Sequence, residues 1–103
     1  MKQLNKYIVE RLHINKDTGN HHYNYHPKTI DELDELVKKL IKERGNDADL
    51  NDIDTSEITD MTDLFYNSKF NGDISNWDVK NVKYMWHMFF RSPLEKNPPK
   101  WYK

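Results

Sequence analysis

The sequence predicts an α+β fold: a short solenoid of strand-helix repeats capped by an N-terminal β-hairpin and an amphipathic helix. Three observations predict it. Residues 49–73 recur as residues 73–97, so that position i matches position i+24. Residues 29–44 carry an apolar stripe at helical spacing, and two stretches rich in β-branched and aromatic residues precede them. Repeats of this length stack, because each unit buries its apolar face only against a neighbour.

Matched positions along the two segments define the repeat. The pairs are Asp49 and Asp73, Leu50 and Ile74, Ile53 and Trp77, Asp54 and Asp78, Ile58 and Val82, Met61 and Met85, and Phe65 and Phe89. We expect the first positions of each unit to form a short strand and the later ones, spaced i, i+3, i+6 and i+7, to form a short helix. Trp101 follows Trp77 at the same i to i+24 offset, so residues 46–103 would hold two to two and a half units.

The second unit contains the pattern FNGDISNWDVxNVxxMxxMF, which runs from Phe70 to Phe89. This pattern resembles the BspA-like repeat family, also called DUF285, and the resemblance covers roughly residues 49–102. It implies a leucine-rich-repeat-like solenoid with a short parallel strand and a short helix in each repeat. It also implies binding of other proteins, a role commonly associated with bacterial surface proteins, and it implies no catalytic residues.

The N-terminal hairpin is predicted from two extended segments and the turn between them. Residues 7–14 are rich in β-branched and aromatic side chains and end at the turn-forming residues 15–20. Residues 21–26 follow as a second strand, which Pro27 ends because the residue before proline avoids helical geometry.

The helix over residues 29–44 has start, stop and stripe signals. Thr29 and Glu32 form a capping box, and Gly45 marks the end. Its apolar stripe consists of Ile30, Leu33, Leu36, Val37, Leu40 and Ile41. We expect this stripe to cover the first repeat, so that residues 1–45 cap the stack and residues 1–103 form a single domain.

Composition is consistent with one small folded unit that binds a protein. The 103 residues include 13% aromatics and no cysteine. Charges interrupt every apolar run near the N-terminus, so we predict neither a secretory signal nor a membrane span, and a cytoplasmic location. Residues 47–79 carry nine acidic side chains against one lysine, whereas residues 80–103 carry six basic side chains against one glutamate. Such a bipolar charge pattern suits a protein partner better than nucleic acid, which favours a continuous basic surface.

Two metal sites are conceivable, and neither is favoured. His13, His21, His22 and His26 lie close in sequence, but no further group of ligands completes a recognisable spacing. Residues 47–52 begin like a calcium loop, yet Asp52 stands where the loop needs glycine and Ile58 where it needs glutamate. We therefore predict no metal and no cofactor.

Catalysis is disfavoured as well. No glycine-rich phosphate loop is present, and no serine has an evident base partner. Asp54 and Asp78 occupy equivalent repeat positions, which favours turn-closing or helix-capping over acid-base chemistry.

The outward face of the predicted second helix is the candidate binding site. It carries Lys83, Tyr84, Trp86, His87, Phe90 and Arg91, and aromatic and arginine side chains are enriched at binding hot spots. A second interpretation is left open, in which Trp86 and Phe90 pack under the C-terminal tail or at the dimer edge of an unfinished solenoid. Tyr66 aligns with Phe90, which indicates that this position is partly buried. Asp52, Asp60 and Asp63 are predicted to steer the partner's approach.

These observations predict a non-enzymatic protein-protein interaction module. One specific version is a stand-alone inhibitor from a phage or other mobile element, similar in role to an anti-CRISPR protein, whose partner is a host nuclease or its ribonucleoprotein. Its acidic stretch would imitate nucleic-acid phosphates. The alternatives are a fragment or short paralogue of a bacterial surface adhesin and, less favoured, a metal-dependent enzyme.

Overall fold

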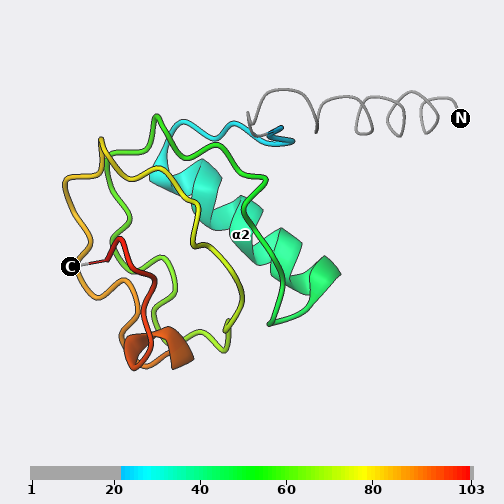
Figure 1. The fold of residues 1–103 in the computed structure, drawn as a ribbon, viewed down its shortest axis with the longest axis vertical. Helices are drawn as coiled ribbons and strands as arrows, with labels where there is room; N and C mark the ends of the chain where they lie inside the picture. Colours follow the sequence, from blue (N-terminus) through cyan, green and yellow to red (C-terminus); the bar gives the residue numbers. More distant parts are fainter. Residues whose placement is uncertain (1–21, 103) are drawn as a thin grey trace, which may run out of the picture.

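The computed structural model describes residues 22–102. Within this part the regular elements are the α-helix α2, Ile30–Arg44, and the short 3-10 helix η1, Pro93–Glu95. The rest of the described chain is turns and coil, which wind beside α2 in successive loops (Figure 1). No helix in this part is both long and apolar enough to cross a bilayer.

Helix α2 forms where the sequence predicts a helix. The Thr29 hydroxyl accepts a hydrogen bond from the Glu32 N–H at 3.2 Å, and the Glu32 carboxylate accepts one from the Lys28 N–H at 2.7 Å. Gly45 ends the helix with φ at 99°, a conformation that glycine adopts at little cost. The predicted apolar stripe faces the core. Three of its residues are buried, Leu33, Val37 and Leu40. The other three are partly buried and pack against the core: Ile30, Leu36 and Ile41.

Two loops of the chain stack in parallel, with position i beside position i+24. Isolated bridges join Asp49 to Asp73 and Asp60 to Tyr84. The Leu50 N–H donates to the Asp73 carbonyl at 2.9 Å, and the Asp73 N–H donates to the Ala48 carbonyl at the same distance. In these two bridges, the paired backbone positions are therefore separated by the same i to i+24 offset as the matched side chains of the repeat.

Residues 61–68, the first coil, and residues 85–92, the second coil, have matching backbones. Both contain left-handed residues at equivalent places, with φ at 60° and 56° in the first and 52° and 64° in the second; these residues are Asp63, Asn67, His87 and Arg91. Each coil also closes three short turns in which the N–H of one residue donates to the carbonyl three residues earlier. The two coils thus follow the same path, one above the other.

The predicted strand-helix solenoid with a β-hairpin cap is wrong. Residues 58–65 and 82–89 form successive turns, because the left-handed residues interrupt the backbone geometry that a helix needs. In residues 22–102 the strand-like pairing is confined to isolated bridges. Tyr25, in the predicted second hairpin strand, pairs in parallel with Ile53. The predicted first strand, residues 7–14, and its turn lie outside the described residues.

The core is a single apolar cluster between α2 and the stacked loops. Phe65 lies at its centre, with its ring 4.9 Å from that of Phe70 and 5.8 Å from that of Phe89. Two tryptophans anchor the stack in the same way: Trp77 Nε1 donates to the Leu50 carbonyl and Trp101 Nε1 to the Ile74 carbonyl, each at 2.9 Å. The described C-terminal residues thus continue the register of the loop before them.

Candidate functional site

Four large apolar side chains of the described residues are exposed, and they come from adjoining parts of the stack. Trp86 is 67% exposed, Tyr84 55%, Tyr66 47% and Phe90 37%. We call these four residues, together with His87, the aromatic face. Exposed aromatic groups of this kind mark interaction surfaces more often than isolated surface apolar residues do.

The turn pattern of the coils explains why these side chains point outward. Leu64 and Phe65 are buried and the next two residues are exposed; in the second coil Met88 and Phe89 are buried and the next two are again exposed. Because the coils stack in register, the exposed Tyr66 comes to lie against Phe90. Their rings are 5.7 Å apart and inclined by only 14°.

Ring contacts join four of the five residues of the aromatic face, Tyr66, Trp86, His87 and Phe90. The His87 ring lies 5.1 Å from that of Phe90 and 5.9 Å from that of Trp86. The Arg91 guanidinium lies 5.5 Å from the centre of the Phe90 ring, within range of a cation–π interaction. The surface is therefore assembled in the protein alone, before a partner arrives.

Trp86 does not pack under the C-terminal tail, as one interpretation of the sequence held. Trp101 and Tyr102 lie instead against Phe89, at ring distances of 6.3 and 4.9 Å. A depression of about 390 Å³ lies between the tail and the chain leading into the second coil. This edge depression is lined by Lys83, Tyr84, Met85, Trp86, His87, Trp101 and Tyr102.

Two of the three predicted steering carboxylates lie beside the aromatic face. Asp63 Oδ1 is 4.0 Å from His87 Nδ1, and Asp60 pairs with Tyr84 through a parallel bridge. The Asp60 side chain also accepts a hydrogen bond from the Thr62 N–H at 2.9 Å, which fixes its position.

The third, Asp52, forms an ion pair within the chain. Both of its carboxylate oxygens accept hydrogen bonds from Arg44 at 3.0 Å, and one accepts a further bond from Asn24 at 2.7 Å. Partial burial acts to raise the pKa of Asp52, but the hydrogen bonds from Arg44 and Asn24 outweigh it and lower that pKa. The prediction that placed Asp52 with the steering groups missed this ion pair.

The carboxylates at equivalent repeat positions close turns, as predicted for Asp54 and Asp78. Asp54 accepts a hydrogen bond from the Ser56 N–H at 3.0 Å, and Asp78 accepts one from the Lys80 N–H at 3.1 Å. Hydrogen bonds from the Lys80 side chain and backbone lower the pKa of Asp78. Both carboxylates thus hold turns of the backbone, and Asp54 also lies 3.2 Å from His26 Nδ1.

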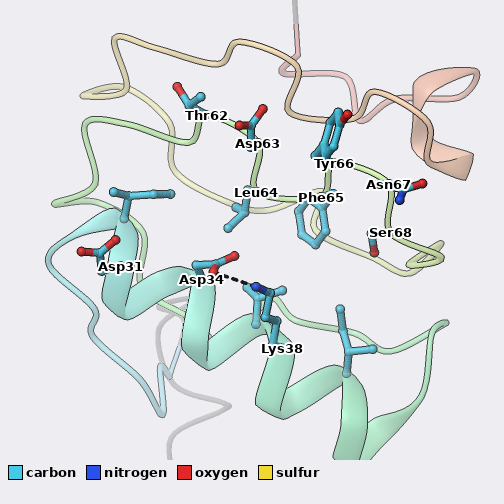
Figure 2. Close-up of a pocket in the computed structure, with 13 residues that line it drawn as sticks. Asp31, Asp34, Lys38, Thr62, Asp63, Leu64, Phe65, Tyr66, Asn67 and Ser68 are labelled. Carbon is cyan, nitrogen blue, oxygen red and sulfur yellow. Dashed lines mark ion pairs between the residues drawn. The ribbon is translucent and has the colours of Figure 1, made fainter.

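A second hollow separates α2 from the first coil (Figure 2). This α2 groove has a volume of about 590 Å³ and a floor that includes the buried Val37, Leu64 and Phe65. Asp34 and Lys38 form an ion pair at 3.0 Å along its helical wall. Tyr66, a member of the aromatic face, and Asp63, which lies beside His87, both line the groove, so the two surfaces are continuous.

The predicted metal-binding candidates are only partly described. Residues 22–102 contain no cluster of three or more histidine, aspartate or glutamate side chains suited to a metal ion. His26 Nδ1 lies 3.2 Å from Asp54 Oδ2, whereas His13 and His21 lie outside the described residues. In the loop that resembles a calcium site, Asp49 Oδ1 accepts hydrogen bonds from the backbone and side-chain amides of Asn51.

Sequence reasoning did not place Tyr66 in the site. Its alignment with Phe90 is visible in the repeat, but by itself the alignment indicated burial. In parallel stacking, equivalent positions lie side by side, so an exposed Phe90 brings Tyr66 onto the same face.

Comparison with known proteins supports the family resemblance. The family described as "Mycoplasma protein of unknown function, DUF285" matches residues 31–102, which include α2 from Asp31 onward and both coils. The chain belongs to the DUF285 family. No curated protein and no solved structure matches it. DUF285 membership is compatible with a non-enzymatic module of the kind found in surface proteins, and the aromatic face of this DUF285 chain lies within the matched region.

Proposed function

We propose that this DUF285 chain is a non-enzymatic module that binds a protein partner through its aromatic face. The observation that carries the proposal is the grouping of all four exposed large apolar side chains of the described residues on and beside two stacked coils. Tyrosine, tryptophan and arginine bury large areas on binding and are the commonest anchors of protein interfaces.

The side chains of the aromatic face are already arranged before binding, which favours tight binding to a partner. Tyr66, His87 and Phe90 already contact one another, so a partner does not have to order them. Binding then costs less conformational entropy than it would with mobile side chains. Trp86, the most exposed of the group, is the natural anchor for a pocket on the partner.

The first prediction concerns this anchor. Trp86→Ala should weaken partner binding by about 2 to 4 kcal/mol, mainly through faster dissociation, because the shortened side chain would no longer fill a pocket on the partner. The partner is obtained by affinity capture from the native cell, with cross-links mapped by mass spectrometry, and dissociation is measured on an immobilised surface. Lys42→Ala, an exposed substitution on α2, is the matched control and should bind like the wild type.

The proposal fails if Trp86→Ala gives a normal circular dichroism spectrum and unchanged dissociation. In that case the aromatic face is packing surface, and the partner must be sought along the acidic residues 47–63.

A narrower form of the proposal is an inhibitor of a host nuclease, encoded by a phage or mobile element and acting in the cytoplasm. Its support is the acidic stretch alone. Asp49, Asp54 and Asp60 hold backbone turns and Asp52 pairs with Arg44, so four of the carboxylates that would imitate phosphates already have partners within the chain. Nuclease assays with the captured partner, with and without the chain, test this form. Cell fractionation separates it from the surface-adhesin alternative.

A further inference from the structure

Within residues 22–102, the second coil has an open backbone edge. In the first coil, the N–H groups of Met61, Asp63 and Phe65 donate to carbonyls of the second coil and the residue before it, at 2.8, 3.0 and 2.9 Å. The second coil repeats this backbone path. The N–H groups of Met85 and His87, which correspond to those of Met61 and Asp63, therefore point away from the first coil. No residue in 22–102 accepts a hydrogen bond from either of them.

This edge offers donors and no acceptors. The Met85 and His87 carbonyls are already used, since they accept from the N–H groups of Met88 and Phe90, both at 3.2 Å. Two copies of the chain placed symmetrically along this edge would bring N–H groups against N–H groups. The edge therefore disfavours symmetric pairing with itself and requires a segment that supplies oxygen acceptors.

A carboxylate already serves as such an acceptor at one place along this coil. Asn67 N–H in the first coil donates to the Phe90 carbonyl at 2.8 Å, whereas its counterpart Arg91 N–H donates to Glu95 Oε1 at 3.2 Å. At Arg91, the Glu95 carboxylate thus takes the place of the carbonyl acceptor that a stacked coil provides at Asn67. Among the described residues, the Met85 and His87 positions have no such replacement.

The edge depression lies over these two donors. Met85 and His87 line it, and Trp86 and Trp101 flank it. Lys83 also lines it, and none of its lining residues is acidic. A segment entering the depression would therefore meet backbone donors, aromatic walls and a positive charge, which together favour an acidic chain.

We propose that the edge depression binds an acidic segment of a partner protein, which runs parallel to the second coil, follows its path and accepts hydrogen bonds from the Met85 and His87 N–H groups. The second coil shows the geometry of such a segment, because its carbonyls and that of Tyr84 accept hydrogen bonds from the N–H groups of the first coil in this way. The inference rests on the proposed function and specifies how the partner is held: by addition of one more coil to the stack, with the aromatic face alongside.

A synthetic peptide copy of residues 59–68 is the probe for this mode of binding. It has the sequence of the first coil and carries Asp60 and Asp63. The full ¹⁵N-labelled chain is titrated with this peptide and followed by NMR. The Met85 and His87 amides should shift, and their hydrogen exchange should slow about tenfold, as expected when a hydrogen bond forms. The Met61 and Asp63 amides are the internal control and should not change, because they already have acceptors.

A second peptide with Asp60→Asn and Asp63→Asn tests the preference for acidic segments. It should bind several-fold more weakly than the acidic peptide. Equal binding of the two peptides would overturn the assignment of an acidic partner.

Three further outcomes contradict the inference. If neither amide responds at millimolar peptide, the edge does not take a segment of this type. If only side-chain signals of the aromatic face respond, binding uses that face without the backbone edge. If the same amides shift as the chain alone is concentrated, the occupant is a second copy. None of these outcomes affects the test of the proposed function, which depends on Trp86→Ala and the captured partner.

Discussion

At the scale of single residues, short polar side chains set the path of the chain. Asp49, Asp54, Asp60, Asp73 and Asp78 each accept a hydrogen bond from the N–H two residues later. Such side-chain turns compete with regular secondary structure by giving the backbone donors another partner. The acidic character of residues 47–79 is thus largely a consequence of how the loops are closed.

The pKa shifts of these carboxylates predict loss of stability in acid. The pKa values of Asp52, Asp54, Asp73 and Asp78 lie below their ordinary values in the folded chain. The unfolded chain therefore binds more protons, and the stabilisation is present above a pH of about 4 and lost as the pH falls through the folded pKa values.

The measurement is the melting temperature between pH 6 and pH 2, which should fall steadily below about pH 4. Asp52→Asn should flatten part of this fall, because it removes one carboxylate whose pKa is lowered in the folded chain. A melting temperature that is constant across this range would contradict the prediction.

At the scale of elements, the coils depend on residues that tolerate a left-handed backbone. Asp63, Asn67 and His87 belong to types that adopt this conformation more readily than most. The left-handed residues lie on both sides of each buried pair, one directly before it and one two residues after it. Stacking of two such coils produces the aromatic face.

Asn67 provides a test of this backbone requirement. Asn67→Val should destabilise the fold by about 1 to 2 kcal/mol, because a β-branched residue is strained at a φ of 56°. Asn67→Gly should leave the free energy of unfolding within about 0.5 kcal/mol of the wild type. Urea unfolding measures both, and equal stability of the two variants would show that the conformation of residue 67 adds no strain.

Helix α2 provides a second test at this scale. Leu40 is fully buried and Leu36 only partly, although both belong to the predicted stripe. Leu40→Ala should cost about 2 to 5 kcal/mol, as expected for a cavity in a packed core, and Leu36→Ala clearly less. If thermal or urea unfolding shows no loss for Leu40→Ala, α2 does not contribute to the core.

At the scale of the whole molecule, the proposed binding surface combines apolar anchors with a separate acidic border. Asp60 and Asp63 flank the aromatic face, and Lys83 and Arg91 lie beside its rings. Anchors and bordering charges act on different steps of binding, since buried groups control dissociation and exposed charges control the rate of encounter.

Neutralising the border should therefore slow association. Asp60→Asn together with Asp63→Asn should lower the association rate and weaken its dependence on salt, with little change in dissociation, because these carboxylates would attract basic groups of the partner that lie outside the acidic segment in the edge depression. Association is measured against the captured partner at two salt concentrations. An unchanged association rate would remove the acidic border from the interaction.

Local signals in the sequence were enough to specify several features of this protein. The cap at Thr29, the apolar stripe and Gly45 specified α2, because helix signals are local and cooperate over a short span. The i to i+24 offset between matched side chains is also the offset between bridged backbone positions. The residues expected on the outward face also proved exposed, although the element that carries them was misassigned.

The remaining features depend on contacts between distant segments. Apolar residues spaced i, i+3, i+6 and i+7 fit a short helix and a series of turns equally well, and the choice depends on hydrogen bonds between two coils that are far apart in sequence. The same distant contacts stacked Tyr66 on Phe90, and a separate long-range contact joined Asp52 to Asn24. Local sequence patterns do not encode such contacts, because their energies arise only when separate segments meet.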